Sequence, residues 1–314
     1  MRNLSLATIF AAASGFVVMW IASWALDAEH GYNSFLAYWG LFFACTGLID
    51  GITQETTRAV AASREMDVRG SANPWKLGAA VGAVVAAVVL LAGLFAMSRI
   101  VPTHPGTATG LLALGLISYA FQAVLSGILS GSGLWNRYAA LVALDSGVRL
   151  VLAVVVWALG GGLVEFLAIT VIGALSWAVI LAFAPVRVHL DVDRGAFLRR
   201  VGSAMVASGA SAALITGFPT AASAAFPAAT AGATVAAINN AVMLTRAPVL
   251  VPLQRFQSAL VVRFVERRDN VYKALAAPVG AILGVGLIGF AAAWLIPRLA
   301  DFARIAPENC FQIS

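Results

Sequence analysis

The stretch from Leu77 to Ser98 reads LGAAVGAVVAAVVLLAGLFAMS and contains no charged residue. About 20 consecutive apolar residues are enough for one α-helix to cross the hydrocarbon core of a bilayer. A helix satisfies its backbone hydrogen bonds internally, which lipid requires, and the stretch lacks the polar–apolar alternation of a membrane β-strand. The segment therefore predicts a transmembrane α-helix.

Stretches of the same kind recur along the whole chain. Lys, Arg, Asp and Glu are absent from residues 3–26, 77–98, 100–136, 166–186, 201–245 and 274–296. Of the 314 residues, 61% are hydrophobic and 11% are charged, whereas an ordinary soluble domain has about 25% charged residues. The chain has too few polar residues to cover the surface of a globular protein in water. We therefore expect an integral membrane protein and exclude a soluble enzyme.

These apolar stretches predict an all-α polytopic membrane protein with about nine transmembrane helices. The predicted spans are residues 5–25, 34–53, 77–98, 109–131, 138–160, 163–185, 201–218, 229–250 and 274–296. Several spans carry glycines four residues apart, such as Gly78 with Gly82 and Gly127 with Gly131. This spacing lets helix backbones approach closely, so we expect tight packing between spans.

The basic residues predict the orientation, because Lys and Arg are retained on the cytoplasmic side of a membrane. One set of connections holds fifteen of them: Arg2, Arg58, Arg64, Arg69, Lys76, Arg137, Arg187, Arg194, Arg199, Arg200, Arg255, Arg263, Arg267, Arg268 and Lys273. The opposite set holds only Arg99, Arg298 and Arg304. We therefore expect a cytoplasmic N-terminus. The net charge of +6 is explained by this topology, and we expect no nucleic-acid partner.

A short internal similarity links two parts of the chain. Residues 34–60 pass through a predicted span into TRAV, from Thr57 to Val60, and residues 229–251 pass through another into TRAPV, from Thr245 to Val249. Coincidence and a true repeat both remain open. If the repeat is real, the spans that start at residues 5 and 201 head two equivalent lobes, as in transporters built from internal repeats.

Motifs for catalysis or cofactor binding are absent from the sequence. The chain contains no phosphate-binding GxxxxGK[ST], no HExxH and no GxSxG. His30, His104 and His189 fall in predicted connections, and Cys45 and Cys310 have no metal-like spacing. We therefore expect no catalytic residue, no metal site and no cofactor.

Charged residues at membrane depth are the candidates for function, because each costs several kcal/mol if it faces lipid. Asp145 and Arg149 lie four residues apart in the fifth predicted span, on one helical face. They are interpreted either as a self-satisfied pair that fixes the rotation of the helix or as the lining of a polar substrate path.

A second group continues the second predicted span at helical spacing. It consists of Asp50, Gln54, Glu55 and Arg58, of which Asp50, Gln54 and Arg58 share one stripe. The stripe is interpreted either as a binding surface for polar headgroups or as an interfacial collar whose side chains extend to water.

The eighth predicted span contains a third group. Arg246 has no acidic residue close in sequence, so it needs a partner in another helix or in an anionic ligand. Asn239 and Asn240 lie one to two turns earlier and are candidates for the same lumen.

Two of these regions resemble a known family. GLIDGITQETTRAV from Gly47 to Val60 and TRAPVLVPLQRFQ from Thr245 to Gln257 resemble the polysaccharide-exporter (Wzx-like) flippases. These belong to the multidrug/oligosaccharidyl-lipid/polysaccharide (MOP) exporter superfamily. The resemblance implies a flippase, not an enzyme, that moves lipid-linked oligosaccharide and polysaccharide precursors across the cytoplasmic membrane.

The resemblance also implies a division into lobes. Family members have two six-helix lobes around a central cavity, so we expect a MATE-like N-terminal lobe of six helices at residues 1–190. A partial second lobe of three helices is expected at 191–300, followed by a short tail at 301–314. The second lobe is thus expected to be shortened at its C-terminal end.

In the implied mechanism, arginines of the cavity attract the pyrophosphate of a polyprenyl-linked glycan, and one lobe rocks against the other. Arg58, Arg149 and Arg246 are the expected anion contacts, since Arg offers a planar fork to phosphate oxygens. The implied partners are this substrate, the bilayer, and glycan-assembly membrane proteins or a second copy. A drug or metabolite exporter of the same superfamily, a degenerate copy and a non-transporting subunit of a glycan system remain alternatives.

Overall fold

A computed structural model describes residues 2–26, 31–63, 70–186, 190 and 192–225, together with the single residues 262, 280 and 284. All regular structure in these ranges is helical. The elements are α1 (Arg2–Ala25), α2 (Gly31–Ser63), α3 (Pro74–Ile100), α4 (Pro105–Gly131), α5 (Trp135–Ala158), α6 (Leu163–Ile172), the 3₁₀ turn η1 (Gly173–Leu175), α7 (Ser176–Phe183) and α8 (Arg194–Ala225).

Six helical segments are long and apolar enough to cross a membrane. They are Arg2–Ala25, Gly31–Ser63, Pro74–Ile100, Pro105–Gly131, Trp135–Ala158 and Leu163–Phe183. The first six predicted spans are thus confirmed as helices of a multi-pass membrane protein. The seventh predicted span lies inside α8, whereas 229–250 and almost all of 274–296 lie outside the described residues. The total of nine spans and the three-part division of the chain therefore stay predictions.

The second span is longer than its predicted range of 34–53. Its helix runs on to Ser63 because the polar residues after Thr53 pair with one another and with neighbouring helices. The sixth span is not one continuous α-helix either. It changes to a 3₁₀ turn at Gly173–Leu175, close to its middle, before it resumes as α7.

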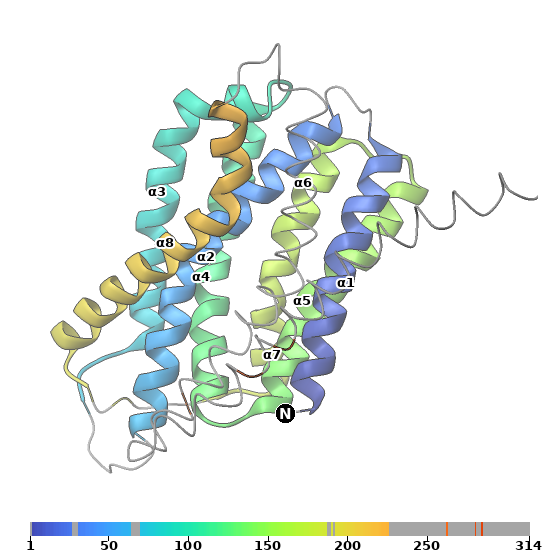
Figure 1. Cartoon of the computed structure of the whole chain (residues 1–314). Helices are drawn as coiled ribbons and strands as arrows, with labels where there is room; N and C mark the ends of the chain where they lie inside the picture. The colour runs from blue at the N-terminus through green and yellow to red at the C-terminus, as the bar shows by residue number, and fades with distance from the viewer. Residues whose placement is uncertain are drawn as a thin grey trace, which may run out of the picture.

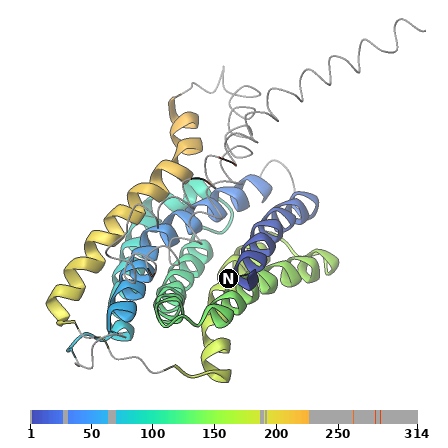
Figure 2. The same cartoon turned by 60° about the horizontal axis from the view of Figure 1, so that its bottom comes forward.

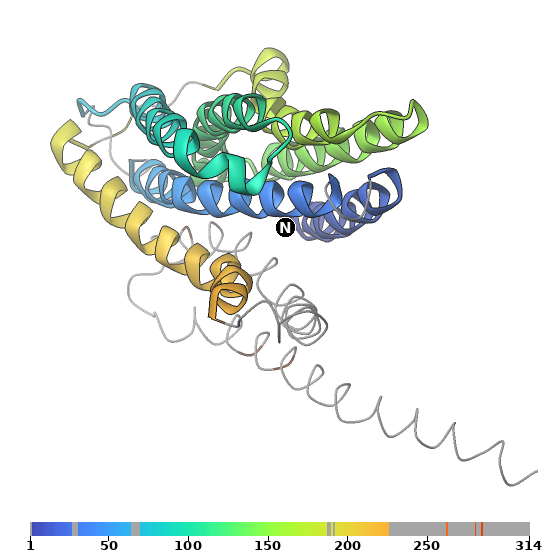
Figure 3. The same ribbon diagram turned by 90° about the horizontal axis from the view of Figure 1, so that it is seen from above.

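The spans are arranged around α4, in which 78% of the most apolar 18-residue stretch is buried inside the molecule. Viewed along the bundle, α2 lies between α8 on one side and α3 with α4 on the other (Figure 3). The first helix packs mainly on α5, although α2 follows it in sequence (Figure 1). The sixth span joins these two groups of helices through contacts with α2, α4 and α5.

Glycines form the tightest helix contacts. A Cβ atom added to Gly127 would lie 2.6 Å from the Cβ of Thr56 and 2.9 Å from the carbonyl oxygen of Thr53, both on α2. One added to Gly131 would lie 2.7 Å from the carbonyl oxygen of Thr57. Such distances are shorter than real Cβ contacts, so α4 and α2 approach this closely only because these side chains are absent. The packing role predicted for this glycine pair is confirmed.

One end of the bundle carries most of the exposed basic side chains. Those described there are Arg2, Lys76, Arg137, Arg194, Arg199 and Arg200. The starts of α1 and α5 meet at this end, where Asn3 Nδ2 donates to Asn136 Oδ1 over 3.0 Å. Arg99 lies at the end of α3, which is the opposite end of the bundle. The alternation of the six spans agrees with the charge pattern, and the assignment of this end to the cytoplasm stays a prediction.

Two connections at the basic end are joined by a clip between residues 70–72 and residues 190 and 192–194. Gly70 N–H donates to the carbonyl oxygen of Leu190 over 2.8 Å, and Ser71 Oγ donates to Asp193 Oδ1 over 3.1 Å. The Gly195 backbone N–H also donates to the Asp193 carboxylate. The hydrogen bonds to the Asp193 carboxylate, first the one from Gly195 and then the one from Ser71, lower the pKa of Asp193, because they favour its charged form. The clip holds the start of α8 beside the start of α3 (Figure 1).

The surface of the spans is apolar, as contact with lipid requires. Leu94 and Phe95 on α3 are 75% and 79% exposed. On the side of α1 and α5, Trp20 and Trp24 have ring centroids 5.0 Å apart, and Trp24 lies 6.2 Å from Trp157. Tryptophans of this kind concentrate where lipid meets water. The position of this cluster, at the end opposite the basic residues, agrees with a membrane boundary there.

Candidate functional site

The polar residues predicted on α2 form a regular stripe in the structure. From Ile49 to Ala61 every side chain is buried except Asp50, Gln54 and Arg58. These three are half-buried and stand at positions i, i+4 and i+8 of the helix, which places them on one face. The helix thus has a single accessible line in this region, and that line is polar.

Neighbouring helices hold this stripe. Tyr119 Oη on α4 donates to Asp50 Oδ1 over 2.7 Å, and Gln54 Nε2 donates to Ser208 Oγ on α8 over 2.9 Å. The stripe therefore runs along α2 between α4 and α8.

Arg58 closes the stripe at the basic end of the bundle. Its Nε donates to Glu55 Oε2 over 2.7 Å, and an Nη donates to the other carboxylate oxygen. The Glu55 side chain is 7% exposed and that of Arg58 is 33% exposed. Glu55 thus orients the guanidinium from the buried side, while part of Arg58 remains accessible.

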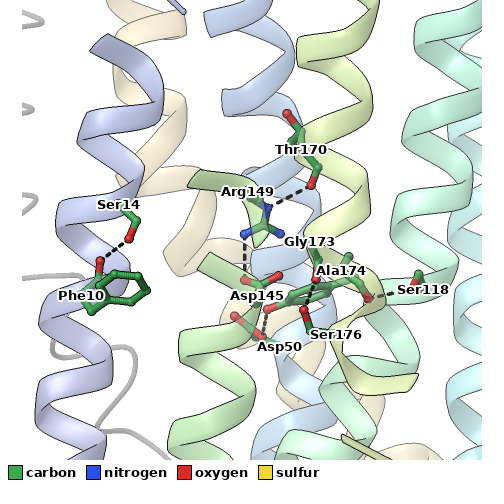
Figure 4. Close-up of polar contacts among 11 residues, drawn as sticks. Phe10, Ser14, Asp50, Ser118, Asp145, Arg149, Thr170, Gly173, Ala174 and Ser176 are labelled. Carbon is green, nitrogen blue, oxygen red and sulfur yellow. Dashed lines mark hydrogen bonds and ion pairs between the residues drawn. The ribbon is translucent and has the colours of Figure 1, made fainter. Parts of the chain in front are cut away.

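The second candidate pair lies deeper in the bundle. Arg149 Nη1 donates to Asp145 Oδ2 over 2.8 Å, and Arg149 Nε donates to the carbonyl oxygen of Thr170 over 3.1 Å (Figure 4). The guanidinium carbon also lies 5.9 Å and 5.4 Å from the ring centroids of Phe42 and Phe43. Arg149 is therefore enclosed by α2, α5 and α6 and bonded on two sides.

One carboxylate oxygen of Asp145 has no donor in this ion pair. Asp145 is 3% exposed, and its Oδ1 has no hydrogen-bond partner among the described residues. A buried acceptor without a donor is costly, because it has lost water without replacement. Arg149 thus donates hydrogen bonds to two partners, whereas Asp145 accepts a bond from Arg149 at only one of its two carboxylate oxygens.

Hydroxyl groups extend the polar network to the sixth span. Ser118 Oγ donates to the carbonyl oxygen of Ala174 over 2.7 Å and accepts a bond from Trp177 Nε1 over 2.9 Å. Ser176 Oγ donates to the carbonyl oxygen of Gly173 over 2.8 Å (Figure 4). These contacts surround the 3₁₀ turn, at the same level as the Asp145–Arg149 pair.

Several members of this network were not predicted from the sequence. They are Ser118, Tyr119, Thr170, Trp177 and Ser208, none of which is charged. Their only signal is a polar group inside an uncharged span, which many packed helices also contain. Among the predicted residues, Asn239, Asn240 and Arg246 lie outside the described residues. The described part of the chain holds no group of three or more His, Cys, Asp or Glu residues suited to a metal ion.

Sequence comparisons give mycobacterial relatives. No family model matches the chain. The uncharacterized protein Mb3654 of Mycobacterium bovis is 33% identical over 300 residues, which cover 92% of this chain and 68% of the relative. Rv3630 of Mycobacterium tuberculosis is 33% identical over 295 residues, covering 91% and 67%. Rv1510 of the same species is 32% identical over 296 residues, covering 92% and 68%.

Structure comparisons give one fold. An outward-facing multidrug resistance MATE family transporter of the MOP superfamily matches with a TM-score of 0.72 and 18% identity, over 93% of this chain and 70% of its own. A MATE protein in complex with MaD5 matches with a TM-score of 0.73 and 20% identity, over 96% and 74%. A MATE protein in a bent conformation gives 0.66 and 17%, over 93% and 70%. At these identities the likeness shows the fold, which is that of MATE proteins.

Proposed function

The chain belongs to the family of the mycobacterial proteins Mb3654 and Rv3630, and we propose that it is a membrane transporter of the MATE type that acts as a flippase for lipid-linked oligosaccharides. The MATE fold supports transport as the general activity. The resemblance of Gly47–Val60 and Thr245–Gln257 to polysaccharide exporters supports the cargo. The proposed location is the cytoplasmic membrane, with the N-terminus in the cytoplasm.

The observation that carries the proposal is the polar stripe of α2. Asp50, Gln54 and Arg58 are the only accessible side chains of a helix segment that is otherwise buried. Facing lipid would cost several kcal/mol for each charge, and a polar path beside the stripe would remove that cost. A path between the two lobes of a transporter is a path of this kind.

Arg58 is the described residue best suited to contact a phosphate. Its guanidinium is held by Glu55 and remains partly accessible, and guanidinium groups match the geometry of phosphate oxygens. Arg149 is enclosed and bonded on two sides, so it supports the bundle around the path more readily than it reaches a ligand. Arg246, with Asn239 and Asn240, is proposed as the matching contribution of the second lobe.

The cargo crosses while its lipid tail stays in the bilayer. In this proposal the pyrophosphate moves along the α2 stripe, and a rocking motion of the lobes exposes it on alternate sides. The α2–α8 contact suits such a motion, because Gly47 and Gly51 on α2 and Gly209 on α8 provide a surface of small residues. Glycan-assembly membrane proteins and a second copy of the chain are proposed as further partners.

A drug or metabolite exporter is the second candidate. The observation that favours it is the match to a multidrug resistance transporter. Increased sensitivity to cationic toxins after deletion of the gene, without any change in lipid-linked glycans, would support this candidate instead.

The test is the amount of lipid-linked oligosaccharide on the cytoplasmic face after deletion of the gene. We expect accumulation, and reversal when the 314-residue chain is expressed again. The Arg58→Ala variant is expected to restore export about 10- to 100-fold more slowly, since a hydrogen bond to a charged group contributes about 1.5–3 kcal/mol. Arg137→Ala is the matched control, because it removes an exposed arginine at the same end of the bundle.

Each outcome has a definite meaning. Accumulation reversed by the wild type and by Arg137→Ala, but slowly by Arg58→Ala, supports the flippase and the role of the stripe. Equal export by both variants contradicts the role of Arg58. If deletion causes no accumulation, the flippase proposal is wrong, and a non-transporting subunit or a degenerate copy takes its place.

A further inference from the structure

The break in the sixth span occurs without a proline, at a segment that contains Gly173 and Ser176. Helix kinks in membranes usually occur at proline, but residues 163–183 contain none. The 3₁₀ turn Gly173–Leu175 nevertheless interrupts the span near its middle. Irregular backbone at membrane depth is tolerated only where protein groups satisfy it. Within the span, Ser176 Oγ donates to the carbonyl oxygen of Gly173, and the surrounding helices supply further donors.

Side chains of two other helices bond the backbone at the break. Arg149 on α5 donates to the carbonyl oxygen of Thr170, three residues before Gly173. Ser118 on α4 donates to the carbonyl oxygen of Ala174, inside the turn. Gly173 has no side chain, and a Cβ atom there would overlap the guanidinium of Arg149. The two donors thus hold carbonyl groups from opposite sides of the turn.

The two halves of the span differ in their packing. In α6 half of the residues are buried, whereas α7 buries only Ser176. Trp177 anchors the start of α7, because its ring lies 5.1 Å from that of Phe121 and its Nε1 bonds Ser118. Phe183, at the other end of α7, is 87% exposed. The helix α7 is the yellow-green helix near the lower edge of the bundle in Figure 2. Farther along α7, Ile180 and Leu181 are partly buried against an apolar cluster of neighbouring helices. The second half of the span is therefore packed less tightly than the first half.

We propose that Gly173–Leu175 is a hinge about which the sixth span bends, and that Arg149 and Ser118 are positioning residues that hold its 3₁₀ turn. When they release the carbonyl groups of Thr170 and Ala174, the proline-free segment is able to form a continuous α-helix. Short 3₁₀ stretches inside helices often mark such hinges. α7 leads through a ten-residue connection to α8, which packs on α2. Along the chain, the hinge therefore lies between the packed first half of the sixth span and the helix beside the polar stripe.

The test measures distances between nitroxide labels in lipid nanodiscs, without any cargo. In a Cys45→Ala/Cys310→Ala background, one pair of labels is placed at Leu94→Cys and Phe183→Cys, which reports on α7. The matched control pair is at Leu94→Cys and Ile172→Cys, which reports on the packed half of the span. These sites are all exposed. Because the readout is a distance, the result is independent of the proposed function.

We expect Ser118→Ala to shift the α7 distance and to leave the control distance unchanged. The eight residues of α7 are about 12 Å long, so a change of 20–30° in the bend moves the far end by about 4–6 Å. Ser118→Thr, which keeps the hydroxyl group, should retain the wild-type distance. Arg149→Lys, which keeps the charge beside Asp145 but loses the second donor of the fork, should shift the α7 distance alone.

Two results would overturn the proposal. One is an α7 distance that stays the same in both Ser118→Ala and Arg149→Lys. The other is an equal change in the α7 and control distances, because a hinge at Gly173–Leu175 moves only the residues that follow it.

Discussion

At the scale of single residues, the pair formed by Asp145 and Arg149 shows how one helix carries two opposite charges into a bundle. Both residues are at least 95% buried, and each charge neutralises the other in apolar surroundings. The gain is limited, because both groups have lost their hydration. Removing one partner of such a pair lowers the stability far more than replacing both partners by apolar residues. This difference in the free energy of unfolding is measurable.

We expect Arg149→Met to destabilise the protein by about 3–5 kcal/mol, since it leaves the buried carboxylate of Asp145 without a partner. The double variant Asp145→Leu/Arg149→Met should be clearly more stable than this single variant. It removes both charges and leaves only the carbonyl oxygen of Thr170 without its donor, at about 1–3 kcal/mol. Equilibrium unfolding in one fixed detergent measures both values. A double variant no more stable than Arg149→Met would contradict this account of the pair.

At the scale of helices, glycine spacing determines how closely α4 packs against α2. We expect Gly127→Ala to destabilise the protein by about 1–3 kcal/mol, because its Cβ atom would lie 2.6 Å from Thr56 and 2.9 Å from a backbone oxygen of α2. Gly110→Ala on the same helix is the control. Its Cβ atom would meet nothing within 4 Å, so this change should be neutral or slightly stabilising. Equilibrium unfolding of the two variants under the same conditions measures the difference in stability. Equal destabilisation by both substitutions would contradict the role of close packing at Gly127.

The helices themselves were largely predictable, because the length of an apolar run decides whether a segment crosses lipid. The extension of α2 to Ser63 and the break at Gly173 were not predictable from hydropathy. Both depend on side chains from other helices, such as Ser208 beside Gln54 and Ser118 beside Ala174. Hydropathy along the chain contains no information about such contacts.

For the candidate site, the positions along one helix were predictable, but the partners on other helices were not. Helical spacing placed Asp50, Gln54 and Arg58 on one stripe, and the structure agrees, because that spacing is a property of a single helix. The donor to Asp50 is Tyr119, 69 positions away in sequence, and nothing local indicates this pairing.

At the scale of the whole molecule, the distribution of charge predicts a cytoplasmic position for the basic end. In a Cys45→Ala/Cys310→Ala background, Thr103→Cys lies exposed between α3 and α4, at the end opposite the basic residues, and Asn136→Cys lies exposed at the start of α5. A maleimide that does not cross membranes should label Thr103→Cys in intact cells. It should label Asn136→Cys only after the cells are opened. The reverse pattern would invert the orientation.

The clip between Ser71 and Asp193 also has a consequence for how the protein is made. The two residues are 122 positions apart, and a ribosome adds roughly 5–20 residues per second, so Asp193 follows Ser71 by roughly 6–24 seconds. Four spans, from α3 to the sixth, must be inserted during this interval. If one of them fails to cross, Ser71 and Asp193 end on opposite sides of the bilayer and never meet. Formation of the clip therefore distinguishes a correctly inserted nascent chain from one that has skipped a span.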